Sequence, residues 1–193
     1  MKKITIILSL FLLIIITFGC SPKVSRINSD QEIDLSGRWN DTDSKLVSEQ
    51  MIQDALSRPW LTNYSEDHNR QPFIVIGTVK NKTSEHISAE TFINDIEREI
   101  LNSGSARIVQ GGAAREELRN ERDDQQDFAS LATMKKWGQE LGADFIMQGT
   151  INSITDSNRR EKLIFYQVDM ELTDLETNEK VWIGNKRIRK VVR

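Results

Sequence analysis

The sequence predicts a mixed α/β fold: a single domain in which a sheet of parallel and antiparallel strands is flanked by about three helices. Two patterns lead to this class. Between residues 73 and 154, apolar strand-like runs alternate with helical patterns, and strands separated by helices tend to pair in parallel. From residue 163 onward, strands follow one another across short turns, which favours antiparallel pairing. A chain of 193 residues suits one hydrophobic core with a segment outside it.

The first twenty residues, MKKITIILSLFLLIIITFGC, are similar to a bacterial lipoprotein signal. Two lysines precede an apolar run from residue 4 to 18, and Gly19 is the small residue before the cleavage site. This run is shorter than the ~20 residues that span a bilayer comfortably. We predict a signal peptide at 1–19 and lipidation of Cys20, the only cysteine; an uncleaved anchor helix is the alternative. Both place residues 21–193 outside the cytoplasm on a membrane tether.

The segment 20–33 is polar and without periodicity, so we predict a lipidated tether followed by a globular domain at 34–193. At ~3.3–3.6 Å per residue, residues 21–33 reach at most roughly 45 Å. Removing 1–19 takes away two of the 26 basic residues and none of the 29 acidic ones, which leaves 24 against 29 and a net charge of −5. This balance argues against a general affinity for nucleic acid. With Cys20 lipidated no disulfide can form, so stability depends on the core.

Apolar residues at helical spacing predict the first helix of the domain. Residues 41–43 offer N-cap candidates, and Pro59 marks the end of the helical pattern. We predict a short edge strand at 34–40 before this helix and a polar loop at 62–71 after it. The apolar face consists of Leu46, Val47, Met51, Ile52, Ala55 and Leu56.

The next segment alternates strands and helices. The continuous apolar run 73–79 predicts a strand buried on both faces. Ser88 can cap the following helix, and residues 102–104 end it. A short strand at 106–110 precedes a helix at 113–126 that carries almost no apolar stripe, so we expect it to be solvated. The inward face of the capped helix consists of Phe92, Ile93, Ile96 and Ile100.

The last part of the chain contains one more helix and three strands. Apolar spacing predicts a third amphipathic helix at 128–141, with Gly142 as its terminator. Strands are predicted at 145–154, 163–172 and 181–191, and the residues 176–179 form the last turn. The inward-facing residues of the middle strand are Ile164, Tyr166, Val168, Met170 and Leu172.

Side chains that could carry catalysis are scarce. The only histidines, His68 and His86, lie in polar segments, and neither has a second His at i+3 or i+4, so no metal site is predicted. The chain has no G-x-S-x-G motif and no free thiol to serve as a nucleophile. Gly111 and Gly112 lie between a strand and a helix but lack the rest of a phosphate-binding motif, which favours an ordinary turn.

Carboxylates are plentiful, but no acid–base pair stands out among them. Glu97, Asp144 and Asp169 are candidates that nothing in the sequence separates from solvated surface charges. We therefore predict no catalytic residue, no cofactor and no metal, and expect that the protein is not an enzyme.

Two features could serve partner binding. The last strand carries a basic stripe that could meet an acidic partner or anionic headgroups, or could protect an edge strand from mispairing. The second feature is the apolar pair Leu163 and Phe165, with Trp182 and Trp60 as possible neighbours, which either marks a protein–protein patch or packs beneath a helix. The stripe consists of Lys186, Arg187, Arg189, Lys190 and Arg193.

Between residues 35 and 191 the chain resembles the LpoB family of penicillin-binding-protein activators. The most specific match is ELGAD, an apolar strand and a glycine, followed by a strand that ends in T-D-x-x-T-x-x-x-V-W. The matching segments are SGRWND (36–41), FIVIGTVKNKTSEHI (73–87), REELRNERDDQQ (115–126), ELGADFIMQGTI (140–151) and VDMELTDLETNEKVWIGNKRIRK (168–190).

This resemblance implies a small αβ domain similar to the N-terminal domain of TolB, without enzymatic activity. It also implies a lipid anchor in the outer membrane, facing the periplasm, and binding to a class A penicillin-binding protein whose peptidoglycan synthesis is stimulated. Our hypothesis is a lipid-anchored, monomeric regulator of such a synthase. The alternative is an envelope assembly or scaffold lipoprotein with a TolB-like core.

Overall fold

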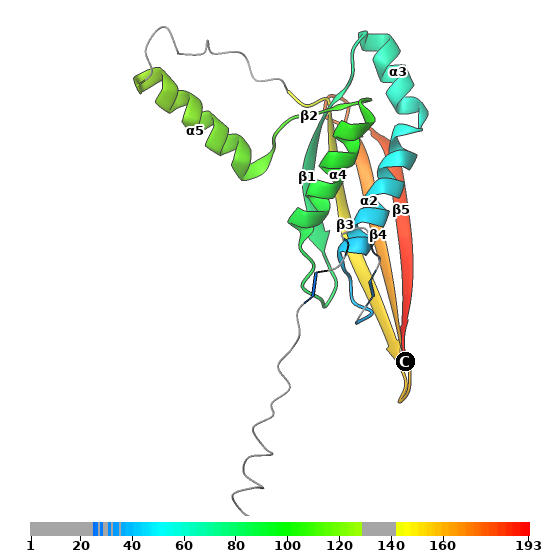
Figure 1. Ribbon diagram of the computed structural model, residues 1–193. Coiled ribbons are helices and arrows are strands. Elements are labelled where there is room, and N and C mark those ends of the chain that lie inside the picture. The colour runs from blue at the N-terminus through cyan, green and yellow to red at the C-terminus, as the bar shows by residue number, and fades with distance from the viewer. Residues whose placement is uncertain (1–24, 27, 29–30, 32, 35, 129–141) are drawn as a thin grey trace, which may run out of the picture. The chain divides into compact units, whose positions relative to one another are not determined.

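Figure 1 shows the computed structural model of the protein, which describes residues 25, 26, 28, 31, 33, 34, 36–128 and 142–193. The chain divides into two units, Met1–Glu32 and Ile33–Arg193, and the second contains every helix and strand named below. The helix predicted at 128–141 lies outside the described residues, except that Phe128 ends the helix before it. Within the described part, none of the helices has the length and the apolar character needed to cross a membrane.

The described part of the second unit contains four helices and five strands. Its helices are α2 (Asp41–Leu56), α3 (Pro59–His68), α4 (Ala89–Ser103) and α5 (Gly112–Phe128). Its strands are β1 (Phe73–Asn81), β2 (Arg107–Ile108), β3 (Phe145–Ser157), β4 (Lys162–Asp174) and β5 (Lys180–Val192).

The strands form one sheet in the order β2-β1-β3-β4-β5. β1 pairs in parallel with β2 and β3, while β3, β4 and β5 pair antiparallel. This is the mixed sheet expected from helix-separated strands followed by a meander, and the predicted fold class is confirmed. The long antiparallel pairings run from the β3–β4 turn at Ser157 to the far end of β4 at Asp174.

Four local predictions are wrong. Asn40, and not a residue of 41–43, caps α2, and β1 is not buried on both faces, because Thr78 is exposed. The other two concern whole segments. Residues 62–71 are not a loop, because α3 covers most of them: Pro59 occupies its first turn, where proline is tolerated, and Asn69 ends it with a left-handed φ of 49°. Trp60 and Tyr64, four residues apart, provide its buried face. The segment 34–40 is not a strand either, since its described residues form bends or irregular structure before the capping box of Asn40 opens α2.

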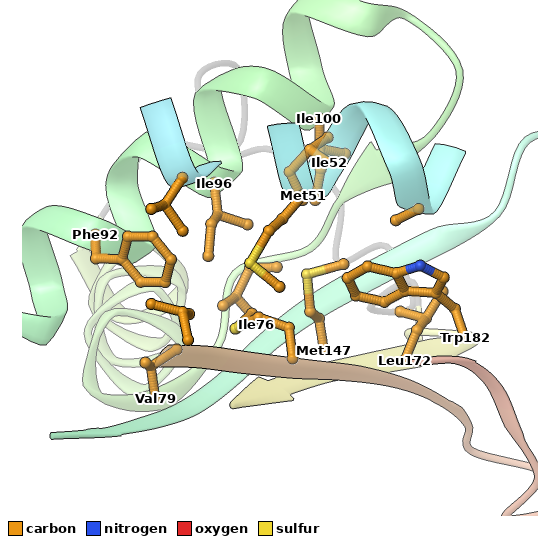
Figure 2. Close-up of a cluster of buried hydrophobic side chains, with 14 of the residues drawn as sticks. Met51, Ile52, Ile76, Val79, Phe92, Ile96, Ile100, Met147, Leu172 and Trp182 are labelled. Atoms are coloured by element: carbon orange, nitrogen blue, oxygen red, sulfur yellow. The ribbon is translucent and has the colours of Figure 1, made fainter. Parts of the chain in front are cut away.

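The core lies between the sheet and the helices α2 and α4, as Figure 2 shows for fourteen of its residues. Phe92 and Ile96 of α4 and Met51 of α2 point toward Ile76 and Met147 on the sheet. We call this helix-covered side of the sheet the inner face and the opposite side the outer face. Each fully buried residue of this size contributes ~1.5–3 kcal/mol through burial, so the two helices hold this side of the sheet firmly.

Residues 33–40, here called the strap, lead from the first unit into α2. The backbone N–H of Trp39 donates to the Glu85 carboxylate (3.2 Å) and to the Tyr166 hydroxyl (3.1 Å), and that hydroxyl donates to Glu85 (2.8 Å). The Trp39 ring packs edge-on against Phe92 and Tyr166, with centroids 6.3 and 5.6 Å away. Burial, together with the Glu85 carboxylate, raises the pKa of Tyr166 above its ordinary value, which keeps its proton available to Glu85.

Candidate binding surface

Strand alternation places four of the predicted partner-binding residues on the outer face. In β4, Ile164 and Tyr166 are buried on the inner face, so Leu163 and Phe165 point to the outer side. The register then puts Phe165 directly opposite Arg189 of β5, and Gln167 opposite Arg187. Both arginines are exposed, Phe165 is half-buried and Leu163 is 40% exposed.

Arg189 and Phe165 form the centre of this group. The Arg189 guanidinium carbon lies 5.8 Å from the centroid of the Phe165 ring, a cation–π contact worth ~0.5–1 kcal/mol at an exposed site. The contact holds the arginine against the sheet and leaves part of both groups open to a partner. Arginine and aromatic side chains are enriched in protein–protein interfaces, which makes this pair the strongest candidate anchor on the outer face.

Two lysines of the basic stripe do not join them. Lys186 and Lys190 alternate with the arginines and lie on the inner face of β5. Lys190 is only 8% exposed, and its ammonium donates to Asp34 (2.8 Å), to the Arg38 carbonyl (3.0 Å) and to Asp43 (2.5 Å). The Lys190 charge is thus paired inside the domain and not available to a partner, so we leave Lys190 out of the proposed surface.

Trp182 and Trp60 are not neighbours of Leu163 and Phe165, contrary to the sequence-based expectation. Both are core residues, 5% and 7% exposed. The Trp182 indole N–H donates to Asp54 of α2 (2.8 Å), and the Trp60 indole N–H donates to the Ala55 carbonyl (2.7 Å). Their polar groups are satisfied by α2, so both rings serve the packing of helices on the inner face.

Three further apolar side chains of the outer face were missed. Ile154 of β3 lies opposite Phe165 and is 67% exposed, while Val191 of β5 lies opposite Leu163 and is 55% exposed. Ile183, 66% exposed, lies at the other end of β5. The period of two, counted outward from the buried residues of each strand, is the sequence signal that could have identified them. We define the outer patch as Ile154, Leu163, Phe165, Arg187, Arg189 and Val191.

A polar ladder separates the outer patch from Ile183. Gln167 donates to the Asp169 carboxylate (2.8 Å), and Asn152 donates to the Thr150 hydroxyl (3.2 Å). These groups border a shallow groove lined by Thr78, Lys80, Gln148, Gly149, Thr150, Asp169, Met170, Glu171 and Ile183. An apolar patch with a polar rim has the composition of a protein-binding surface.

The three candidate carboxylates lie in separate places. Asp169 is on the outer face, Glu97 is on α4 at the inner face, and Asp144 precedes β3. Burial raises the pKa of Glu97. Among the described residues, no three His, Cys, Asp or Glu side chains gather closely enough to hold a metal ion. His68, stacked on Tyr64 at a centroid distance of 4.0 Å, is part of the α3 packing.

Asp144 ties the starts of two strands together. Its carboxylate accepts two hydrogen bonds from Arg70 (2.8 Å each) and one from the Phe73 N–H (2.8 Å), and its side chain is 18% exposed. Burial alone would raise the pKa of Asp144, but Arg70 and the Phe73 amide together hold it below the ordinary 3.8. Asp144 is therefore a structural anion in this fold.

Asp144→Asn is expected to lower the free energy of unfolding by about 2 kcal/mol at pH 7, since hydrogen bonds to a charged group are lost. A depressed folded-state pKa means that the stabilisation is present above the unfolded pKa and is lost as the pH falls through the folded value. The difference between wild type and variant should therefore shrink below about pH 4. Urea denaturation across this range measures it, with Glu116→Gln, whose ion pair is exposed, as the control. A difference that stays constant with pH would contradict this role.

The protein is thus a mixed α+β domain with an arginine-containing apolar surface on the outer face of its sheet. The family model of the peptidoglycan-synthase activator LpoB matches residues 43–188. The chain therefore belongs to the LpoB family of peptidoglycan-synthase activators.

Solved structures with a similar chain course include two LpoB C-terminal domains. The domain from Escherichia coli is 13% identical with a TM-score of 0.47, and that from Salmonella enterica is 13% identical with a TM-score of 0.46; both alignments cover 77% of this chain and 99% of the other. The lipoprotein GNA1162 from Neisseria meningitidis is 15% identical with a TM-score of 0.41, covering 62% of this chain and 83% of its own. Among curated proteins, no sequence matches this chain.

Proposed function

We propose that this protein is a lipid-anchored envelope regulator that binds a class A penicillin-binding protein and activates its peptidoglycan synthesis. The observation that carries the proposal is the outer patch: Arg187 and Arg189 lie exposed beside Phe165 and Leu163, in a chain that belongs to a family of synthase activators. Cys20 carries the lipid, the anchor lies in the outer membrane, and the domain faces the periplasm. The protein acts as a monomer and has no enzymatic activity of its own.

Activation without chemistry requires differential binding. A regulator shifts its target toward the active state only if it binds that state more tightly than the resting one. The outer patch suits this role because an aromatic and arginine anchor within an apolar surface can contribute most of the energy of an interface. The two exposed arginines add charge complementarity to an acidic surface of the synthase, which speeds association and fixes orientation.

The test uses residues 33–193, which form one unit that contains the whole described core. This protein is added to each purified class A synthase of the same organism, and glycan polymerisation and cross-linking are measured. We expect faster synthesis with at least one of them. If none responds, the proposed activity is wrong. Light scattering adds a second check, because a ring-sized species would favour the assembly role over a monomeric regulator.

The double variant Arg187→Gln/Arg189→Gln should weaken binding to the responsive synthase about tenfold, or more, since two exposed charges and the contact to Phe165 are lost. The matched control is Arg58→Gln/Arg98→Gln, which removes the same charge from two exposed arginines outside the sheet. Titration of the synthase by fluorescence anisotropy compares them. Equal weakening by both variants would show an unspecific charge effect and remove the outer patch from the proposal.

A further inference from the structure

The strand β5 forms one edge of the sheet, and half of its backbone groups point away from the sheet. It has thirteen residues, and its only strand neighbour in the described part of the chain is β4. Native edge strands are usually short, bulged or broken by proline, because a free edge invites pairing with another chain. β5 contains no proline, and its one irregularity lies at its start, opposite Leu172 and Thr173.

The hydrogen-bond pattern identifies which residues point outward. Near the two ends of the β3–β4 pairing, the Asn158 N–H donates to the Glu161 carbonyl and the Leu175 N–H to the Asp144 carbonyl, both at 2.9 Å. Residues of antiparallel strands alternate between their two neighbours, so the odd-numbered residues of β4 bond to β3 and the even-numbered ones to β5. The register pairs Tyr166 with Ile188, hence the even-numbered residues of β5 bond back to β4.

The odd-numbered residues of β5 therefore direct their N–H and C=O groups to the free edge. Among the described residues, none of these groups takes part in a further backbone hydrogen bond. From residue 183 onward these residues carry their side chains on the outer face, where all five are exposed. Side chains and free backbone groups thus form one row: Ile183, Asn185, Arg187, Arg189 and Val191.

We propose that the partner adds an acidic extended segment to this edge as a sixth strand. The proposal rests on the proposed function for the identity of the partner, and it specifies how that partner is held. Residues 180–193 include six basic residues and no acidic one, so a second copy of β5 would place like charges opposite one another. A segment with carboxylates opposite Arg187 and Arg189 gains cross-strand pairs instead.

The row also predicts the sequence pattern of the added segment. Its side chains on the outer face should be apolar opposite Ile183 and Val191, acidic opposite Arg187 and Arg189, and polar opposite Asn185. Main-chain hydrogen bonds would provide affinity and these alternate side chains specificity, as in other cases of strand addition. The outer patch then continues from Phe165 through Arg189 onto the added strand.

Hydrogen exchange in the complex tests the geometry directly. In the free domain, amides of even-numbered residues such as Lys186 and Ile188 should be protected and those of Arg187 and Arg189 should exchange fast. With the responsive class A synthase bound, the odd-numbered amides of 183–191 should slow by at least about tenfold. A complex in which these amides keep the free-domain rate would overturn strand addition.

A proline at one residue whose N–H points to the free edge of β5 tests the same inference by mutation. Asn185→Pro removes an N–H that none of the described strands uses, at a position where edge strands accept proline, while Asn185→Ser keeps that N–H. Asn185→Pro should weaken synthase binding about tenfold and Asn185→Ser should not. Equal binding by the two variants overturns the inference but leaves the proposed function standing if Arg187→Gln/Arg189→Gln still weakens binding. If no synthase binds the wild type, both the strand-addition inference and the proposed function are wrong.

Discussion

Replacing Lys190 with methionine should lower the free energy of unfolding of residues 33–193 by about 3–5 kcal/mol, the cost of breaking a buried ion pair by removing one partner. The Lys190 side chain is 7% exposed, and each of its three N–H groups has an acceptor: Asp34, Asp43 and the Arg38 carbonyl. Methionine fills a similar volume but leaves Asp43, whose side chain is 8% exposed, without its counter-charge.

The loss should extend beyond one contact because Lys190 joins three segments. It lies on β5, Asp43 stands in the first turn of α2, and Asp34 and Arg38 belong to the strap. Urea denaturation of Lys190→Met and of the exposed control Arg187→Met measures the effect, and the control should stay within about 0.5 kcal/mol of wild type. A Lys190→Met protein within about 1 kcal/mol of wild type, roughly the value of an exposed pair, would contradict this account.

The double variant Lys190→Met/Asp43→Asn distinguishes the cost of the unpaired Asp43 charge from the loss of the other Lys190 hydrogen bonds. The amide that replaces the Asp43 carboxylate carries no net charge, so part of the loss caused by Lys190→Met should be recovered. Recovery would be incomplete, because Asp43 also accepts the Asn40 N–H (2.9 Å) in the capping box of α2. A double variant that loses the sum of the two single losses would mean that the pair is not coupled.

Local sequence patterns predict the sheet well, because the order of apolar and polar residues within a strand indicates which of them are buried. The alternation in β4 identifies both the strand and its faces. The continuous run in β1 identifies a strand but not its faces, because burial on both faces was predicted and Thr78 is exposed. The strap is different, since its conformation depends on Lys190, Tyr166 and Glu85, which lie far away in the sequence. No periodicity within residues 34–40 carries that information. α3 was missed because its ten residues bury only Trp60 and Tyr64.

The candidate site also shows what local sequence patterns cannot predict, because residues that are neighbours in the sequence do not share one surface. The basic stripe from Lys186 to Lys190 looks like one surface in the sequence, yet a strand sends neighbouring side chains to opposite faces. Arg187 and Arg189 lie on the outer face with Phe165, whereas Lys190 is buried on the inner one. Applying the period of two from buried Trp182 would have divided the stripe. Only the fold supplies the partners of Lys190, because Asp34 and Asp43 precede it by about 150 residues.

Trp182→Ala should destabilise the same domain by about 3–5 kcal/mol, the range for removing a large buried aromatic side chain. The ring is 5% exposed and joins β5 to α2 through the indole N–H on Asp54. The ring lies over Gly184 of its own strand, where a Cβ atom would come within 2.1 Å of the ring. Figure 2 shows the indole beside Leu172 at one side of the core. Alanine would leave a cavity that the surrounding core closes only in part.

Trp182→Phe distinguishes the hydrogen bond from the packing. The Trp182 N–H, followed by Arg58, holds the pKa of Asp54 below its ordinary 3.8. That stabilisation is present above the unfolded pKa and is lost as the pH falls through the lower folded value, so Trp182→Phe should lose less stability at about pH 3 than at about pH 7. Trp182→Ala, which loses the packing as well, should stay strongly destabilised at both. Urea denaturation at the two pH values decides between them: if Trp182→Phe is as unstable as Trp182→Ala throughout, the indole acts through its shape alone.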